Sequence, residues 1–178
     1  MTELLRPVER IAHGLAIVAN AVGTLVVLGL VLIVNYDVVA RNGFNAPFLG
    51  AVEVVQFSMV LIVFLQLPDV VRVDRLTRSD GFLLLMGHRY PGVARVVRRF
   101  INLISALFMV LIAYVTWPEF LHMLDTRDYF GVPGVFTAPW WPVKLTIFAS
   151  AALTALIFAL KVLTGTDQRA AEPKDGTA

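Results

Sequence analysis

The chain has 178 residues, of which 58% are hydrophobic and only 16% are charged, and its mean hydropathy is +0.76. Soluble domains carry about 25% charged residues, and a chain this short could not bury several long apolar segments inside a soluble core. The arginines lie beside these segments, so membrane topology explains the pI of about 9.2 better than nucleic-acid binding does. Without cysteine the chain can form no disulfide, iron–sulfur cluster or c-type haem attachment.

The first predicted membrane span covers residues 11–36, a run without a charged residue. This run is longer than the roughly 20 residues with which a helix crosses about 30 Å of hydrocarbon. The apolar region of a cleaved signal peptide usually ends after about 7 to 15 residues, whereas this run continues well past Ala21. We therefore expect an uncleaved first span.

The second predicted span covers residues 47–70, and Glu53 is the one charged residue between Phe44 and Pro68. In the connection that follows, Ser79-Asp80 can cap a short helix over residues 81–88. The apolar run of this helix is too short to cross the bilayer, so we expect the helix to lie in the membrane interface.

The third predicted span covers residues 95–118. Pro91 suits the first turn of a helix, which predicts a helix from Pro91 to Trp117 that is longer than the hydrocarbon core is thick. A row of arginines falls on one face at the start of this helix and is expected to meet lipid headgroups or a partner protein: Arg95, Arg98 and Arg99.

The fourth predicted span covers residues 140–163, with Lys144 near its start. Trp117, Trp140 and Trp141 fit the tryptophans that anchor helices at headgroup depth, although a subunit contact could use the same residues. The segment 166–178 is short and polar, which predicts a disordered tail. The predicted fold class is an all-α integral membrane protein with four transmembrane helices, in which residues 1–165 form a single domain.

The basic residues predict the orientation of the spans. Most lysines and arginines lie before the first span, between the second and third spans, or, like Lys161, at the end of the fourth span. Because basic flanks stay in the cytoplasm, both termini and the central connection should be cytoplasmic. The two outer connections then face the opposite compartment.

The spans offer little chemistry of their own. A membrane haem site needs paired histidines, and the chain has only His13, His88 and His122, all near predicted helix ends or in connections. A self-sufficient transporter usually carries ionisable residues or broken helices near mid-membrane, whereas Glu53 and Lys144 lie near span ends. We therefore predict no catalytic, cofactor-binding or metal-binding residue and no enzyme activity.

The turn between the first two spans carries the most distinctive pattern. Arg41 follows the first span, Phe44-Asn45-Ala46-Pro47 comes next, and Glu53 opens the second span. This pattern resembles the small permease subunit of tripartite ATP-independent periplasmic (TRAP) transporters. Val71-Arg72-Val73-Asp74 and Gly131-Val132-Pro133 are similar to later elements of the same family.

The resemblance implies a non-catalytic small subunit of a secondary, Na⁺-driven importer of organic acids in the bacterial inner membrane. In this family a larger membrane subunit holds the substrate and sodium sites, the small subunit widens the fixed scaffold, and a periplasmic solute-binding protein delivers the solute. The chain departs from the family where Pro68-Asp69-Val70 replaces an element with small residues and histidine. A membrane anchor for a redox or regulatory complex is the alternative function.

Four residues of the turn are candidate structural or subunit-interface residues: Arg41, Asn45, Pro47 and Glu53. Arg41 and Glu53 flank the proline-containing turn at the membrane boundary, where an ion pair between them would fix the turn. The alternative is that each side chain reaches water or lipid headgroups separately. Phospholipids are therefore expected partners of the chain, whereas nucleic acid is not.

Overall fold

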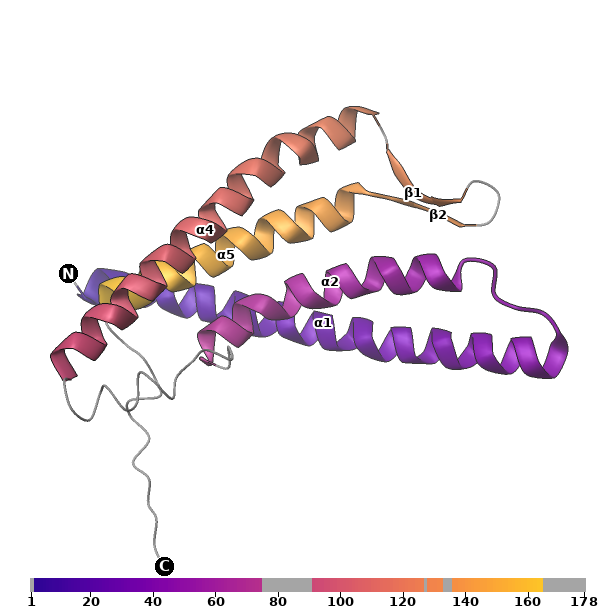
Figure 1. The fold of residues 1–178 in the computed structure, drawn as a ribbon, viewed down its shortest axis with the longest axis horizontal. Helices are drawn as coiled ribbons and strands as arrows, with labels where there is room; N and C mark the ends of the chain where they lie inside the picture. Colours follow the sequence, from indigo (N-terminus) through magenta and orange to yellow (C-terminus); the bar gives the residue numbers. More distant parts are fainter. Residues whose placement is uncertain (1, 75–90, 127, 133–135, 165–178) are drawn as a thin grey trace, which may run out of the picture.

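The computed structural model describes residues 2–74, 91–126, 128–132 and 136–164. These residues form the helices and strands labelled in Figure 1: α1 (Thr2–Phe44), α2 (Ala51–Arg72), α4 (Pro91–Thr126), β1 (Tyr129–Val132), β2 (Phe136–Pro139) and α5 (Trp141–Thr164). All four helices are long and apolar enough to cross a membrane, which confirms the predicted architecture at this level. The predicted interfacial helix over residues 81–88 and the predicted tail over residues 166–178 lie outside the described residues.

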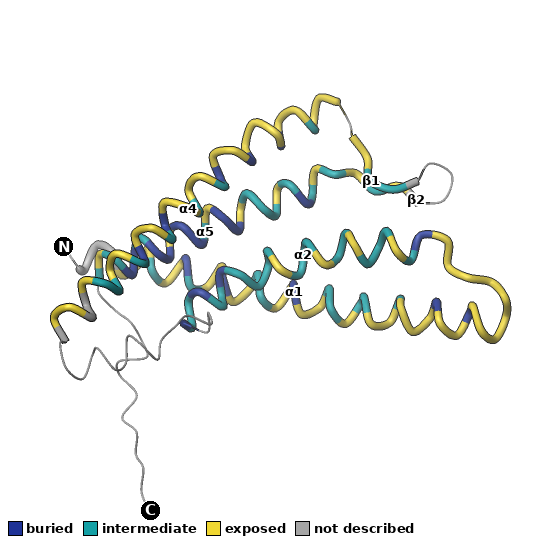
Figure 2. Tube along the Cα trace, in the orientation of Figure 1, coloured by how far each residue is buried: buried dark blue, intermediate teal, exposed yellow. Residues whose placement is uncertain are grey.

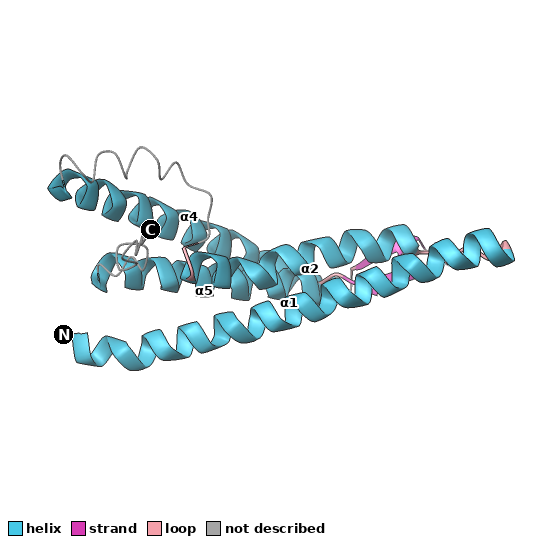
Figure 3. Cartoon of the chain, turned by 90° about the horizontal axis from the view of Figure 1, so that it is seen from below, coloured by secondary structure: helices cyan, strands magenta, loops and turns pink. Residues whose placement is uncertain are grey.

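The four helices form an open layer rather than a closed bundle. Helices α1 and α2 make one antiparallel hairpin, α4 and α5 make another, and α5 packs on α2. We call the end that holds the amino terminus the N-terminal end, and the opposite end, with the α1–α2 turn and the β-hairpin, the hairpin end (Figure 1). At the N-terminal end α5 also contacts α1, and Figure 3 shows α1 and α4 on opposite sides of α5 there. Helix α5 is therefore central: 44% of the residues in its most apolar stretch are buried, against 6% for α1.

The buried core lies at the N-terminal end, where all four helices contribute to it. Alanines of α1 and α4 pack there against larger side chains of α2 and α5: Ala12, Ala16, Ala106, Val71, Ile157, Phe158 and Leu160. Most other large apolar side chains are exposed, as Figure 2 shows along α1 and α4. Such a surface would drive association in water, whereas lipid chains are as apolar as these side chains, so the distribution fits a protein solvated by lipid.

Helices α1 and α2 approach each other closely at Gly23. A Cβ atom added there would lie 3.0 Å from Gln66 Cγ and 3.2 Å from Leu65 Cβ, both in α2. Small residues permit such close contact between helices in a membrane. At Gly29, six residues further along α1, an added Cβ would meet nothing within 4 Å, so the close approach is local.

Two helices are much longer than a membrane is thick. Helix α1 has 43 residues and α4 has 36, which correspond to about 64 Å and 54 Å, against a hydrocarbon core of about 30 Å. The uncharged run of α1 over residues 11–36 is about 39 Å long, so it fits the core with a tilt of about 40°. The predicted end of the third helix at Trp117 is wrong, because α4 continues through Pro118 to Thr126. A proline inside a helix removes one backbone hydrogen bond, and here the helix persists on both sides of it.

The β-hairpin between α4 and α5 was not predicted from the sequence. Strands β1 and β2 pair in antiparallel register, with Phe130 opposite Ala138. The ring of Phe130 lies 5.0 Å from the ring of Trp140 and 6.5 Å from the ring of Phe57 in α2. The hairpin thereby connects the start of α5 to α2 at the hairpin end.

Candidate functional site

One lysine of α5 is paired with a carboxylate just after α2, and the other with a carboxylate of α4. At the N-terminal end, Lys161 Nζ donates to Asp74 Oδ1 at 2.5 Å and to the carbonyl oxygen of Val71 at 2.6 Å. At the hairpin end, Lys144 forms an ion pair with Glu119 of α4. No other residue of α5 is charged, and the 17 residues from one lysine to the other correspond to about 25 Å. Helix α5 is therefore held at both ends of its apolar stretch.

The Lys161–Asp74 pair is buried where α2 ends. Only 8% of the Lys161 side chain and 10% of the Asp74 side chain are exposed. Asp74 adopts a left-handed backbone conformation with φ of 53°, which aspartate tolerates better than most residues, and its N–H donates to the Val71 carbonyl oxygen at 3.3 Å. Within the described residues, Asp74 Oδ2 is buried without a hydrogen bond, so Lys161 is the side chain that neutralises this carboxylate.

A serine of α5 compensates for the proline inside α2. Pro68 has no N–H, so the carbonyl oxygen of Phe64, one turn earlier, loses its helical hydrogen bond. The hydroxyl of Ser150 donates to this carbonyl oxygen. In hydrocarbon an unsatisfied carbonyl is costly, and a hydroxyl from a neighbouring helix is a common solution. The contact therefore lets α2 keep its proline and fixes α5 beside it.

A second polar cluster joins α1 to α2. Asn20 Nδ2 donates to Asp69 Oδ2 at 3.0 Å, and Arg72 Nε donates to Asp69 Oδ1 at 2.8 Å. The Asp69 side chain is 15% exposed and that of Arg72 is 21% exposed. Asp69 lies in the segment where the sequence departs from the family pattern, and the structure gives it the two partners that a poorly solvated carboxylate needs.

The structure gives Arg41 a partner other than Glu53. Arg41 NH2 donates to Asp37 Oδ2 at 2.9 Å, and Asp37 Oδ1 accepts the backbone N–H of Phe48 at 2.8 Å. Asp37 lies one helical turn before Arg41, a spacing that favours such pairs, and it links the end of α1 to the following turn. The predicted Arg41–Glu53 ion pair is not formed. Glu53 lies half-buried in the first turn of α2, where the helix dipole favours a carboxylate.

The other candidate residues of the turn shape the backbone. Asn45 has φ of 51°, which ends α1, and the N–H of Ala46 then donates to the carbonyl oxygen of Ala40 at 3.1 Å. Pro47 is exposed beside them. Gly50 has φ of 112°, a conformation that favours glycine, and it directly precedes α2. The turn is thus built from residues suited to its backbone conformations.

The predicted membrane anchors lie at opposite ends of the molecule. Arg98 is half-buried and Arg99 is exposed near the start of α4, at the N-terminal end, where the backbone also places Arg95. At the hairpin end, the ring of Trp117 lies 4.8 Å from that of Phe148, Trp140 contacts Phe130, and Trp141 is 44% exposed. Arginines and tryptophans therefore do not form one site. Their separation along the helices is the one expected of anchors in two opposite interfaces.

Sequence reasoning missed the residues that make the strongest contacts. Asp69 and Asp74 were named only as parts of the family comparison, Lys161 was used only in the count of basic residues, and no hydrogen bond was predicted for Ser150. These contacts could have been suspected from the sequence, because each polar side chain lies at the edge of, or inside, a long apolar run, where it needs a partner.

Within the described residues, no three histidine, aspartate or glutamate side chains are placed to share a metal ion.

Four apolar helices, with charged side chains that pair within the chain, define a multi-pass membrane protein. A family model described as tripartite ATP-independent periplasmic transporters, DctQ component, matches residues 30–167. The chain therefore belongs to this family and is the small membrane component of a TRAP transporter. No curated protein and no solved structure matched the chain.

Membership of this family has two implications, one for enzyme activity and one for partners. The family consists of transporter subunits and is not an enzyme family. Its place in a tripartite system implies a large permease subunit and a solute-binding protein as partners. The matched residues run from the second half of α1 to the end of α5, so they include the turn, the β-hairpin and the contacts of α5.

Proposed function

We propose that this chain is the non-catalytic scaffold subunit of a Na⁺-driven TRAP importer in the bacterial inner membrane. The observation that carries the proposal is the double attachment of α5, through Lys161 to the end of α2 and through Lys144 to α4. These contacts connect the helices of the chain to one another and resist relative movement. A scaffold requires this property, whereas a moving transport domain does not.

The pairing of charged residues in the described part of the chain also favours a scaffold role. A sodium site needs several oxygen atoms converging in a cavity at a broken helix. Here three carboxylates with little exposure are each paired with a basic residue of the same chain: Asp37 with Arg41, Asp69 with Arg72, and Asp74 with Lys161. We therefore assign substrate and ion binding to the large permease subunit, and choice among organic acids to that subunit and the solute-binding protein.

The proposed orientation places the N-terminal end in the cytoplasm and the hairpin end in the periplasm. Basic residues concentrate at the former, and this asymmetry is the usual determinant of topology. In this arrangement Arg95, Arg98 and Arg99 meet anionic headgroups. The turn with Arg41, Asn45, Pro47 and Glu53 then faces the periplasm and is our candidate for a subunit contact.

Reconstitution into liposomes tests this function. Three preparations are compared: this chain alone, the large subunit with the solute-binding protein, and all three proteins together. We expect Na⁺-driven uptake only from the complete set, while solute binding by the soluble receptor is unchanged throughout. Uptake by this chain alone, or full uptake without it, would contradict the scaffold role. A haem or quinone spectrum in the purified chain would favour the alternative of a redox anchor.

A further inference from the structure

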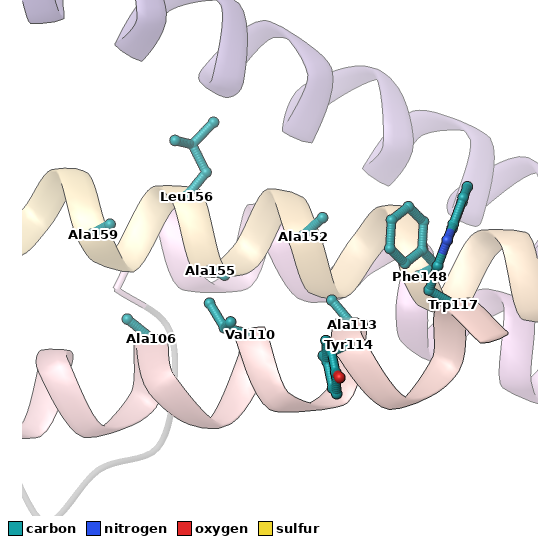
Figure 4. A pocket seen from close by; sticks show the side chains of 10 residues that line it. All are labelled: Ala106, Val110, Ala113, Tyr114, Trp117, Phe148, Ala152, Ala155, Leu156 and Ala159. Carbon is teal, nitrogen blue, oxygen red and sulfur yellow. The ribbon is translucent and has the colours of Figure 1, made fainter.

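A groove of about 660 Å³ runs between α4 and α5. Small side chains of both helices line it, among them Ala106, Ala113, Ala152 and Ala159. Figure 4 shows Ala106 and Ala113 of α4 and Ala155 of α5 between the two backbones, with Phe148 and Trp117 together at one end of the row. The rings of these two residues, which lie 4.8 Å apart, mark the end of the groove nearest the hairpin end.

The groove lies within the apolar part of the two helices. Its residues in α4 run from Ala106 to Trp117, and the nearest charged residues of that helix are Arg99 on one side and Glu119 on the other. Nearly all of its lining is apolar; Tyr114 and Trp117 contribute the only polar side-chain groups. The occupant is therefore a component of the membrane rather than a solute from water.

The dimensions of the groove distinguish a hydrocarbon chain from a helix. From Ala106 to Trp117 the groove extends for about 16 Å, which is about half of the 30 Å hydrocarbon core and matches the depth of one leaflet. A volume of about 660 Å³ over this length gives a cross-section of about 40 Å². A helix with its side chains is about 10–12 Å wide and needs about 80–110 Å². A third helix is therefore too wide to lie wholly inside the groove, whereas an extended acyl chain can.

Charged groups of both signs lie immediately beyond the Phe148–Trp117 end. Lys144 stands one helical turn before Phe148, on the same face of α5, and pairs with Glu119 of α4. The Glu119 side chain is 54% exposed and that of Lys144 is 22% exposed, so both remain accessible to a further ligand. Trp117 beside them is a residue type favoured at headgroup depth. An ammonium and a carboxylate together complement a headgroup that itself carries both charges.

We propose that this groove binds one acyl chain of a zwitterionic phospholipid, whose phosphate contacts Lys144 and whose cationic group contacts Glu119. The lipid belongs to the leaflet on the side of the hairpin end. Its chain would cover the exposed side chains of Ala152 and Leu156 and the half-buried side chain of Ala159, above a floor of buried alanines. The proposal requires only that the chain spans a membrane, so it stands independently of the scaffold role.

Photo-crosslinking identifies the occupant directly. Leu156 lines the groove and is 40% exposed, so the variant Leu156→benzoylphenylalanine places a photoreactive group there in the complete chain. After irradiation of cell membranes containing the assembled transporter, mass spectrometry of the purified chain should show an added phospholipid. A cross-link to another protein, or no lipid adduct, would overturn the proposal.

Filling the groove tests its shape with a matched control. Ala152 and Ala149 are both exposed alanines of α5, but only Ala152 lines the groove. In Ala152→Phe the amount of phosphatidylethanolamine retained by the detergent-purified chain, measured by native mass spectrometry, should fall about tenfold, because the ring occupies the space of the acyl chain. Ala149→Phe should retain as much lipid as the unaltered chain. Equal retention by the two variants would overturn the proposal.

The headgroup contact has its own measurement. Lys144→Gln removes the ammonium that contacts the phosphate and should lower phosphatidylethanolamine retention while leaving the groove open. Competition with phosphatidylglycerol of the same acyl composition tests the choice of headgroup in the unaltered chain. Phosphatidylethanolamine should be retained in preference to phosphatidylglycerol. Preference for the anionic lipid, or no effect of Lys144→Gln, would overturn the assignment of the headgroup site.

Discussion

Removing the charge of Lys161 should destabilise the protein strongly. The side chains of Lys161 and Asp74 are only 8% and 10% exposed, so Lys161→Met leaves a carboxylate buried without its counter-ion. Breaking a buried ion pair by removing one partner costs about 3–5 kcal/mol, and the free energy of unfolding should fall by about that amount. Equilibrium unfolding in mixed detergent micelles, followed by tryptophan fluorescence, measures this quantity.

The other end of α5 supplies the matched control. Lys144→Met is the same substitution on the same helix, but its partner Glu119 is largely exposed, so the loss of stability should be much smaller. The double variant Lys161→Met/Asp74→Asn removes both buried charges, keeps a residue that tolerates the left-handed backbone at position 74, and should recover most of the stability lost in the single variant. If Lys161→Met costs no more than Lys144→Met, or if the double variant is the least stable of the three, the argument from burial is refuted.

Three further outcomes are expected. Ser150→Ala should lower the free energy of unfolding by about 0.6–2 kcal/mol, and by less in a Pro68→Ala background, where the helical hydrogen bond is restored; equal losses in both backgrounds would contradict the compensation. Gly23→Leu should separate α1 from α2 and lower thermal stability in detergent, whereas Gly29→Leu, at an open position, should not; similar melting temperatures would argue against the close approach. Asp125→Cys, in a chain with no other cysteine, should react with an impermeant thiol reagent from the periplasm, and labelling only after cell lysis would reverse the proposed topology.

The helices could be predicted from the sequence because the bilayer imposes their length. A run such as residues 11–36 must be helical to satisfy its backbone in hydrocarbon, whatever it packs against. The start of α4 at Pro91 was predicted for a local reason, since proline fits a first helical turn, and the structure confirms it. The continuation beyond Pro118 was missed because proline was taken as a stop, whereas one lost hydrogen bond did not end the helix.

Which helix packs on which could not be predicted. The faces of α1 and α4 are rich in similar leucine and valine side chains, and nothing in such a pattern distinguishes a lipid-facing surface from a helix contact. The central position of α5 depends on contacts between residues far apart in the sequence, such as Lys161 with Asp74. The contact of Arg41 with Asp37 is different, because it joins residues one turn apart and the helical spacing rule could have suggested it.

The polar contacts of α5 have a role that apolar packing cannot fill. Alanine-rich and leucine-rich faces can slide along one another in lipid with little change in contact, so they define the axial position of a helix poorly. Three polar contacts, made by Lys144, Ser150 and Lys161, lie at separate levels along α5, and a slip of one turn, about 5.4 Å, would break all of them. Buried polar pairs are best attested in this function of fixing register. Under the proposed function this register sets the depth at which the scaffold holds its partner. This gives a reason why the few charged residues of α5 pair with residues of the same chain.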